Sequence, residues 1–236
     1  DIKEIAEVVH RHEIPLIVDE AHGAHFRFSE YFPVSAAELG ADVVVQSFHK
    51  TLPSMTQTAV LHVCSDMVDV GKIKRFMGIY QTSSPSYILM ASMDACMDKL
   101  QKDGKQMFRE FTYNLEKARQ RLSKCEKIKL IEASMLQGTG IYDYDRSKLL
   151  FSTVGTSING HQLHEILRDR YHIEMEMEAE KYALGIAAVG DTEEGFDRIC
   201  SAIEEIDAET ELVSVAEESQ ENTSHARMKQ LMTISK

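Results

Sequence analysis

Two residues that can do chemistry lie just beyond short apolar runs. Asp19 comes directly after the apolar residues 16–18, and Lys50 follows the run "VVVQSF". Such runs are typical of buried strands, and open α/β sheets bind their ligands beyond the carboxyl ends of strands. A partly desolvated lysine loses its proton more easily and can act as an amine nucleophile that forms Schiff bases. The simpler interpretation is a solvated lysine, because most lysines are exposed.

A carboxylate and a lysine at one edge of a sheet are compatible with a plain salt bridge. They are also what pyridoxal phosphate requires, since it needs a lysine to hold it and an acid to keep its pyridine nitrogen protonated. Ala21 is small enough for a flat ring to lie against it. Ser47 and His49 can hydrogen-bond or neutralise a phosphate.

The elements around these residues predict a layered α/β domain. A helix over 2–12 precedes the strand 16–18, and Ser35 is expected to cap a short helix that Gly40 stops. Strands are predicted over 41–47 and 56–64, so the order is helix, strand, helix, strand, strand. Further helices are expected over 66–77 and over 86–124, the second with a break near Asp103 and Gly104, and a polar loop over 81–87 precedes the longer one.

The second half of the chain has a different texture, with short apolar runs between helical patterns. It predicts a compact α+β unit. The predicted strands cover 128–133, 148–154, 172–178 and 183–189, and the predicted helices cover 159–171 and 193–206. The chain is thus expected to divide into residues 1–126, a small α+β domain over 127–208, and a linker or tail over 209–236.

Composition limits the class of protein. The 236 residues have a formal net charge of −12, which argues against nucleic acid or an anionic membrane as the main partner. No apolar run approaches the roughly 20 residues that a membrane-spanning helix needs, and no signal peptide is apparent at the start. The four cysteines lack CxxC spacing, so we expect reduced thiols in a cytoplasmic protein, most of them packed in the core.

Closely spaced histidines raise the question of a metal site. His22 and His25, and likewise His161 and His164, are separated by two residues. Zinc sites use such pairs together with further ligands at short spacing. No such ligands follow either pair, so we expect no metal site.

The segment "HIEMEME" alternates acidic and apolar residues. As a strand it would place Glu174, Glu176 and Glu178 on one face and the apolar residues on the other. A solvated face explains this pattern. The alternative is that Glu174 or Glu176 recognises the distal cation of a basic substrate.

Three stretches together resemble a known family. They are "DEAHGAHFRF", "SAAELGADVVVQSFHKTLPSMTQTAVLHV" and "QTSSPSYILMASMDACM". They look like the large domain of the pyridoxal-phosphate-dependent ornithine/lysine/arginine decarboxylases, which have the fold type I of aspartate aminotransferase. The resemblance implies a partial large domain with a mainly parallel sheet over 1–126, followed by the small α+β domain. It also implies decarboxylation of arginine, lysine or ornithine to a polyamine-pathway amine and carbon dioxide, in a cytoplasmic homodimer or higher homo-oligomer.

The resemblance also implies roles for individual residues. Lys50 would form the Schiff base with pyridoxal 5'-phosphate, and Asp19 would pair with the pyridine nitrogen. Ala21 would pack against one ring face, and His22 would lie close to the cofactor without an assigned role. The remaining implied contacts are to phosphate: Ser47 and His49 within the subunit, and Thr82, Ser83 or Ser84 to the neighbouring subunit.

The chain departs from the family in its extent. It begins inside an amphipathic pattern and lacks the upstream half of the large domain and the usual C-terminal domain. The expected activity therefore belongs to the intact protein. Two alternatives stay open: another fold-type-I enzyme, such as an aminotransferase or a lyase, and an inactive truncated remnant.

Overall fold

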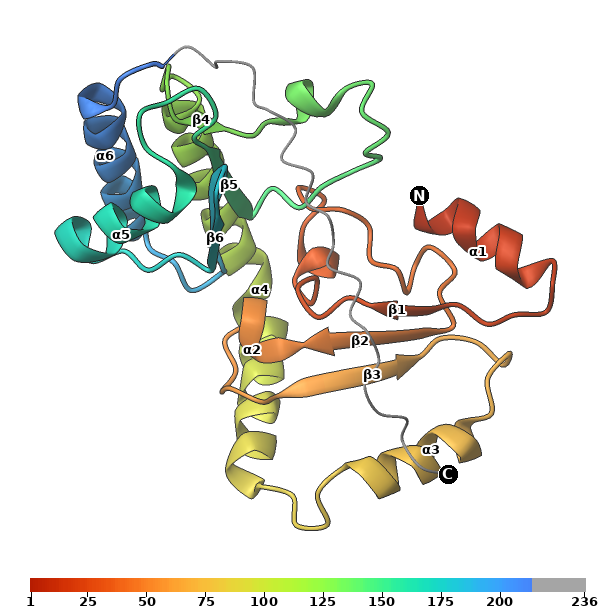
Figure 1. Cartoon of the computed structure of the whole chain (residues 1–236). Helices are drawn as coiled ribbons and strands as arrows, with labels where there is room; N and C mark the ends of the chain where they lie inside the picture. The colour runs from red at the N-terminus through yellow and green to blue at the C-terminus, as the bar shows by residue number, and fades with distance from the viewer. Residues whose placement is uncertain (214–236) are drawn as a thin grey trace, which may run out of the picture.

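The computed structural model describes residues 1–213, which form two sheets joined by a long helix (Figure 1). The first sheet has the order β1-β2-β3. β1 is parallel to β2, with Asp19 opposite Val45, and β3 runs antiparallel to β2. The α/β class is confirmed, and β1 and β2 end at the same edge. The bounds are β1 Ile17–Asp19, β2 Val43–Ser47 and β3 Ala59–Val63.

The two faces of this sheet have different neighbours, because strand side chains alternate. Val44 is fully buried in a small cluster with Leu16, Val18 and Ile2, the last from α1 (Ile2–His10). Val43 and Val45 point the other way, toward α3 (Val70–Tyr80). A largely apolar hollow of about 750 Å³ separates this face from α3.

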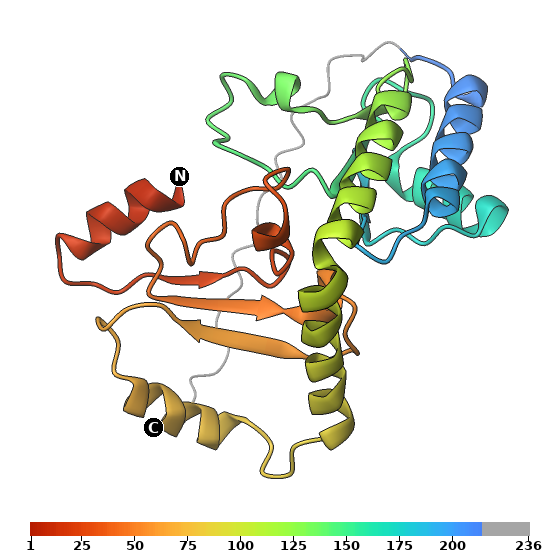
Figure 2. The same ribbon diagram turned by 180° about the vertical axis from the view of Figure 1, so that it is seen from behind.

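The helix α4 (Tyr87–Leu122) runs past the first sheet and on to the second (Figures 1 and 2). It is one continuous helix of 36 residues, so the predicted break near Asp103 and Gly104 is wrong. Gly104 is buried, in the core-facing stripe that includes Leu100 and Phe108. Burial of that stripe stabilises the helix enough to outweigh the poor helix propensity of one glycine.

The second sheet is antiparallel, with the order β4-β5-β7-β6. Its core includes Phe151 and Ala183, both fully buried, and contacts the buried stripe of α4 within one hydrophobic cluster. This confirms a small α+β unit in the second half. The bounds are β4 Lys129–Leu130, β5 Lys148–Ser152, β6 Met177–Ala179 and β7 Tyr182–Ile186, with α5 Gly160–Tyr171 and α6 Glu193–Glu209.

Several predicted elements differ from the structure. The strand expected over 172–178 is reduced to β6, and its alternation fails because Met175 is buried while Met177 is 44% exposed. Only the end of the segment pairs with β7, so its earlier residues follow no sheet face. Residues 36–40 form turns instead of a short helix, and α3 starts at Val70, where Asp69 caps it. Two short 3-10 helices were not predicted: η1 (Phe26–Phe28) and η2 (Ala133–Leu136).

The cysteines are free thiols. Cys96, Cys125 and Cys200 are buried and Cys64 is exposed, so the packing role predicted for most of them is confirmed. The domain boundary at 126/127 stays a prediction. The tail predicted over 209–236 lies mostly outside the described residues.

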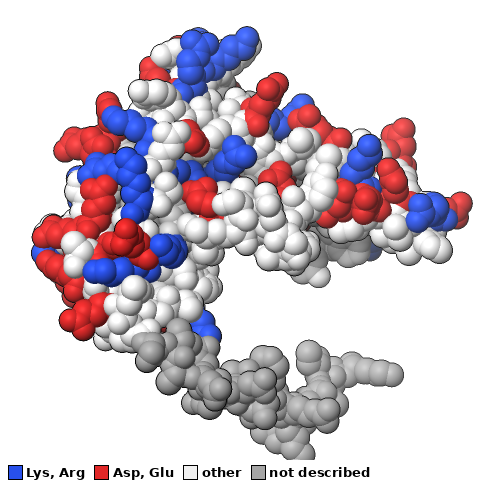
Figure 3. All heavy atoms as spheres, turned by 90° about the horizontal axis from the view of Figure 1, so that it is seen from above, with Lys and Arg blue, Asp and Glu red and all other residues white. Residues whose placement is uncertain are grey.

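The surface seen in Figure 3 carries acidic and basic side chains interspersed, without a broad basic patch. This agrees with the net charge of −12. Within residues 1–213, no helix combines the length and the apolar character needed to cross a membrane.

Candidate active site

The predicted pair of Asp19 and Lys50 lies in one cavity of about 520 Å³. Asp19 is the last residue of β1. β2 ends at Ser47, and Lys50 lies one turn later, in the short helix α2 (Phe48–Thr51). We call this cavity the Lys50 pocket. It is lined by Asp19, Glu20, Ala21, His22, Gly23, Phe26, Lys50, Asp145 and Lys148.

Lys50 contacts a histidine from the loop after β1. Its Nζ lies 3.0 Å from Nε2 of His22. Burial lowers the pKa of His22, and the charges of Lys50 and Lys148 lower it further. A neutral His22 that accepts from the Lys50 ammonium carries its proton on Nδ1, which is buried and has no hydrogen-bond partner within the described part of the chain.

The loop after β1 is held by its own backbone. The Ala21 N–H donates to Oδ1 of Asp19 at 3.0 Å, and the Ser47 N–H donates to the Ala21 carbonyl at 3.3 Å. The Glu20 N–H donates to the Val45 carbonyl at 2.9 Å. These bonds fix Asp19 and Ala21 against the end of β2. The short helix α2, which carries Lys50, follows directly.

Glu20 anchors this loop to the segment 35–36 and to β2, a role that the sequence did not reveal. Its buried carboxylate accepts from the Ser35 hydroxyl at 2.8 Å, from the Ala36 N–H at 2.9 Å and from the Gln46 amide at 2.6 Å. These donors compensate a buried charge. Gly23 belongs to the same packing, because a Cβ there would lie 2.5 Å from the Glu20 side chain.

The second sheet also contributes to the Lys50 pocket. Oδ2 of Asp145 accepts from Lys148 at 2.7 Å and from the Ser147 hydroxyl at 2.8 Å. Nε2 of the buried His25 lies 3.3 Å from Asp145. Burial alone raises the pKa of Asp145, but the hydrogen bonds and charges of His25 and Lys148 outweigh it and hold that pKa far below its usual range. Sequence reasoning missed this group, since no local pattern links it to the loop after β1.

Several predicted site residues lie outside the lining of the Lys50 pocket. Ser47 precedes α2 and its side chain makes no capping bond, while Nδ1 of His49 donates to the Thr58 carbonyl at 3.0 Å. Three predicted phosphate contacts lie together in the exposed loop between α3 and α4: Thr82, Ser83 and Ser84.

The two candidate substrate residues have different neighbours. Glu174 is exposed and lies 3.3 Å from Nε2 of His164. Glu176 does not line the pocket, yet its carboxylate acts on His22 and raises the pKa of that imidazole against the larger lowering effects. Of the two carboxylates, Glu176 is therefore the one whose charge acts on a residue of the Lys50 pocket.

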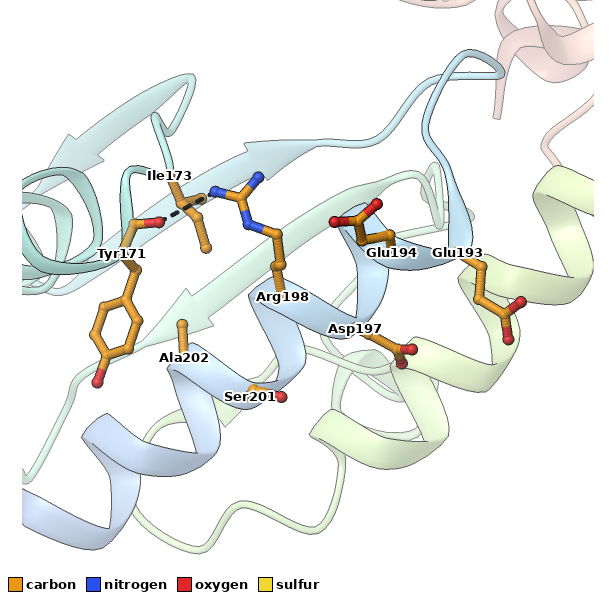
Figure 4. A pocket seen from close by; sticks show the side chains of 8 residues that line it. All are labelled: Tyr171, Ile173, Glu193, Glu194, Asp197, Arg198, Ser201 and Ala202. Carbon is orange, nitrogen blue, oxygen red and sulfur yellow. Dashed lines mark hydrogen bonds between the residues drawn. The ribbon is translucent and has the colours of Figure 1, made fainter.

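A second hollow, of about 570 Å³, lies against α6 (Figure 4). Arg198 crosses it and donates to the Tyr171 carbonyl at 3.2 Å, and Glu193, Glu194 and Asp197 lie along its rim. None of the predicted site residues lines it, and no lysine does. Within residues 1–213, no group of three or more histidine, cysteine, aspartate or glutamate side chains is arranged to hold a metal ion.

Comparison with known proteins assigns a family. Residues 1–184 match the family model described as "Orn/Lys/Arg decarboxylase, major domain". The chain belongs to the Orn/Lys/Arg decarboxylase family. The resemblance carried by "DEAHGAHFRF" and "VVVQSFHK" is thus confirmed at the level of the family.

Curated relatives of this chain include two arginine decarboxylases. The protein of Bacillus subtilis (strain 168) is 33% identical over 206 residues, which are 87% of this chain and 42% of that protein. The protein of Bacillus anthracis is 32% identical over 208 residues, 88% of this chain and 42% of that protein. The chain thus spans less than half the length of these relatives.

Solved structures show the same fold. The Francisella novicida lysine decarboxylase LdcF superposes with a TM-score of 0.69 at 16% identity, covering 86% of this chain and 34% of that one. Alanine–glyoxylate aminotransferase from Nostoc sp. gives 0.60 at 14% identity, covering 87% and 57%. This confirms the fold predicted from the resemblance, which decarboxylases and aminotransferases share.

Proposed function

We propose that this chain carries part of the active site of a pyridoxal-phosphate-dependent decarboxylase that acts on arginine, lysine or ornithine. The products would be the corresponding polyamine-pathway amine and carbon dioxide. One observation carries the proposal: Lys50 and Asp19, from the ends of adjacent parallel strands, line the same cavity. Family membership supports the reaction type.

The residues present fit the cofactor. The Lys50 amine would hold it, and Asp19 would bind its ring nitrogen. Ala21 and His22 also line the pocket, and the buried Nδ1 of His22 has no partner in the described part of the chain, so it is a donor left for a ligand. When bound, pyridoxal phosphate supplies an electron sink for the bond to the departing carboxylate. Ser47, His49 and one of Thr82, Ser83 or Ser84, the last from a second subunit, would complete the phosphate contacts.

A neighbouring histidine positions the amine of Lys50. With Nε2 of His22 at 3.0 Å and the imidazole neutral, the Lys50 ammonium has an acceptor beside it. His22 can therefore accept a hydrogen bond from Lys50 and orient its amine. We propose that this contact orients the amine for attachment, and that Lys50 or a histidine supplies a proton to the substrate carbon after carbon dioxide leaves.

The substrate's distal cation needs a carboxylate. Glu176 supports this role better than Glu174, because its charge reaches His22 in the pocket. Substitution Glu176→Gln should raise KM for the basic substrate with little effect on kcat. Glu174→Gln is the matched control, since it removes an exposed carboxylate beside His164.

A product assay tests the reaction type directly. The purified protein is incubated with the cofactor and each basic amino acid, and carbon dioxide, amine and keto acid are measured. Release of carbon dioxide with an equal amount of amine supports the proposal. A keto acid in their place would identify an aminotransferase, and the absence of any product would favour a remnant without activity.

A further inference from the structure

The Lys50 pocket holds two amines that come from different sheets. Lys50 follows β2, and Lys148 is the first residue of β5. In the proposed function Lys50 is occupied by the cofactor. His22 is held neutral by burial and by both amines, which lower its pKa. Among the described residues that line the pocket, Lys148 is therefore the cation left for a ligand's negative charge.

The ammonium of Lys148 is oriented and has a donor to spare. Its Nζ lies 2.7 Å from Oδ2 of Asp145 and 3.1 Å from the Ser147 hydroxyl. An ammonium carries three protons, so two partners leave one for a further acceptor. The negative charge of Asp145 is itself shared, because that carboxylate also contacts His25 and accepts from Ser147. Lys148 thus keeps part of its attraction for an anion.

We propose that Lys148 binds the carboxylate of the amino-acid substrate. The inference rests on the proposed function and deepens it, since any amino acid that reaches Lys50 brings a carboxylate into this pocket. Asp145 and Ser147 act as positioning residues for the ammonium. The cofactor's phosphate is the other anion that could meet Lys148, and the experiment below separates the two.

The attraction should appear in substrate binding more than in turnover. It is present while the substrate carries its carboxylate and disappears as neutral carbon dioxide forms. An interaction that is stronger in the ground state lowers KM without raising kcat. The decarboxylated amine lacks the group altogether, so its affinity should not depend on Lys148.

The test compares amino acids with their decarboxylated amines on the cofactor-loaded protein. KM is measured from carbon dioxide release for arginine, lysine and ornithine, and inhibition constants are measured for agmatine, cadaverine and putrescine as competitors. In Lys148→Met, KM for the amino acid that wild type converts should rise roughly tenfold or more, and the inhibition constant of its amine should change less than about twofold. Lys148→Arg keeps the charge and should recover most of the loss. Lys117→Met is the control, because it removes another 2.7 Å lysine–carboxylate pair that lies outside this pocket.

Other results would overturn the assignment. An equal loss for amino acid and amine, or no loss for either, would show that Lys148 does not bind the carboxylate. Weaker binding of the cofactor, with the ratio of amino acid to amine affinity unchanged, would assign Lys148 to the phosphate. If wild type gives carbon dioxide and amine, any of these outcomes refutes only the role of Lys148, and the proposed function stands. If wild type binds no basic amino acid and gives no product, the proposed function fails with it.

Discussion

His25 and Asp145 lie 120 residues apart in the chain, and their side chains meet at 3.3 Å beside the Lys50 pocket. His25 belongs to the loop after β1, and Asp145 lies three residues before Lys148, the first residue of β5 in the second sheet. The contact joins the loop that carries Asp19 and His22 to the sheet that carries Lys148. Both side chains are largely buried, so water cannot readily take the place of either hydrogen-bonding partner.

Breaking this contact should destabilise the protein. Asp145→Asn keeps the shape but removes the charge that His25 and Lys148 face, and should lower the free energy of unfolding by about 1–3 kcal/mol. In a double-mutant cycle with His25→Ala, the two losses should be less than additive. Urea unfolding provides the measurement. Asp143→Asn, an exposed change two residues away, is the control, and additive losses would show that the two residues do not interact.

The imidazole of His22 should titrate at low pH. Its pKa is lowered by burial, then by Lys50 and Lys148, so its midpoint should fall below the ordinary value of about 6.5. Because the folded state favours the neutral ring, His22 should reduce stability as the pH falls below that value. NMR titration of the cofactor-free protein gives the midpoint. Lys50→Met should raise it, and an unchanged midpoint would contradict the 3.0 Å contact.

Substitutions at the adjacent residues Asp19 and Glu20 should affect different properties, the first catalysis and the second stability. Asp19→Asn should reduce decarboxylation roughly 100-fold or more while leaving the fold intact, because in the proposed function Asp19 would stabilise charge on the cofactor. Glu20→Gln should lower the free energy of unfolding by about 1–3 kcal/mol, because an amide cannot accept from all the donors around it. Steady-state kinetics and urea unfolding on both variants separate the effects. Similar kinetic losses without destabilisation in both variants would refute this division.

Gly104→Ala should stabilise α4. A Cβ at this position meets only Leu100 side-chain atoms, the nearest at 3.8 Å, and alanine favours a helix interior by about 1 kcal/mol over glycine. Gly160→Ala is the opposite case, because its Cβ would lie 2.1 Å from two backbone carbonyl oxygens. Thermal unfolding should therefore shift upward for the first variant and downward for the second. A destabilised Gly104→Ala would mean that the helix does bend there.

Local patterns predicted the first half of the candidate site. Short branched runs identified β1 and β2, and their common direction brings Asp19 and Lys50 to one edge. The contribution of the second sheet had no such signal. Asp145 and Lys148 meet the loop after β1 only through the packing of distant segments, which sequence spacing does not encode.

Two of the wrong predictions have a common cause. Gly104 resembles a helix stop, but its place in a buried stripe overrides its propensity. The alternation of Glu174, Met175 and Glu176 resembles a strand, but the register with β7 begins only at Met177. In both cases tertiary contacts outweighed the local pattern.

The most direct test of the central claim is to identify the amine that holds the cofactor. The protein is incubated with pyridoxal phosphate and reduced with borohydride, and the modified peptide is found by mass spectrometry. We expect stoichiometric modification of Lys50 alone, lost in Lys50→Ala and kept in Lys148→Met. Modification of Lys148, of scattered lysines or of none would contradict the account.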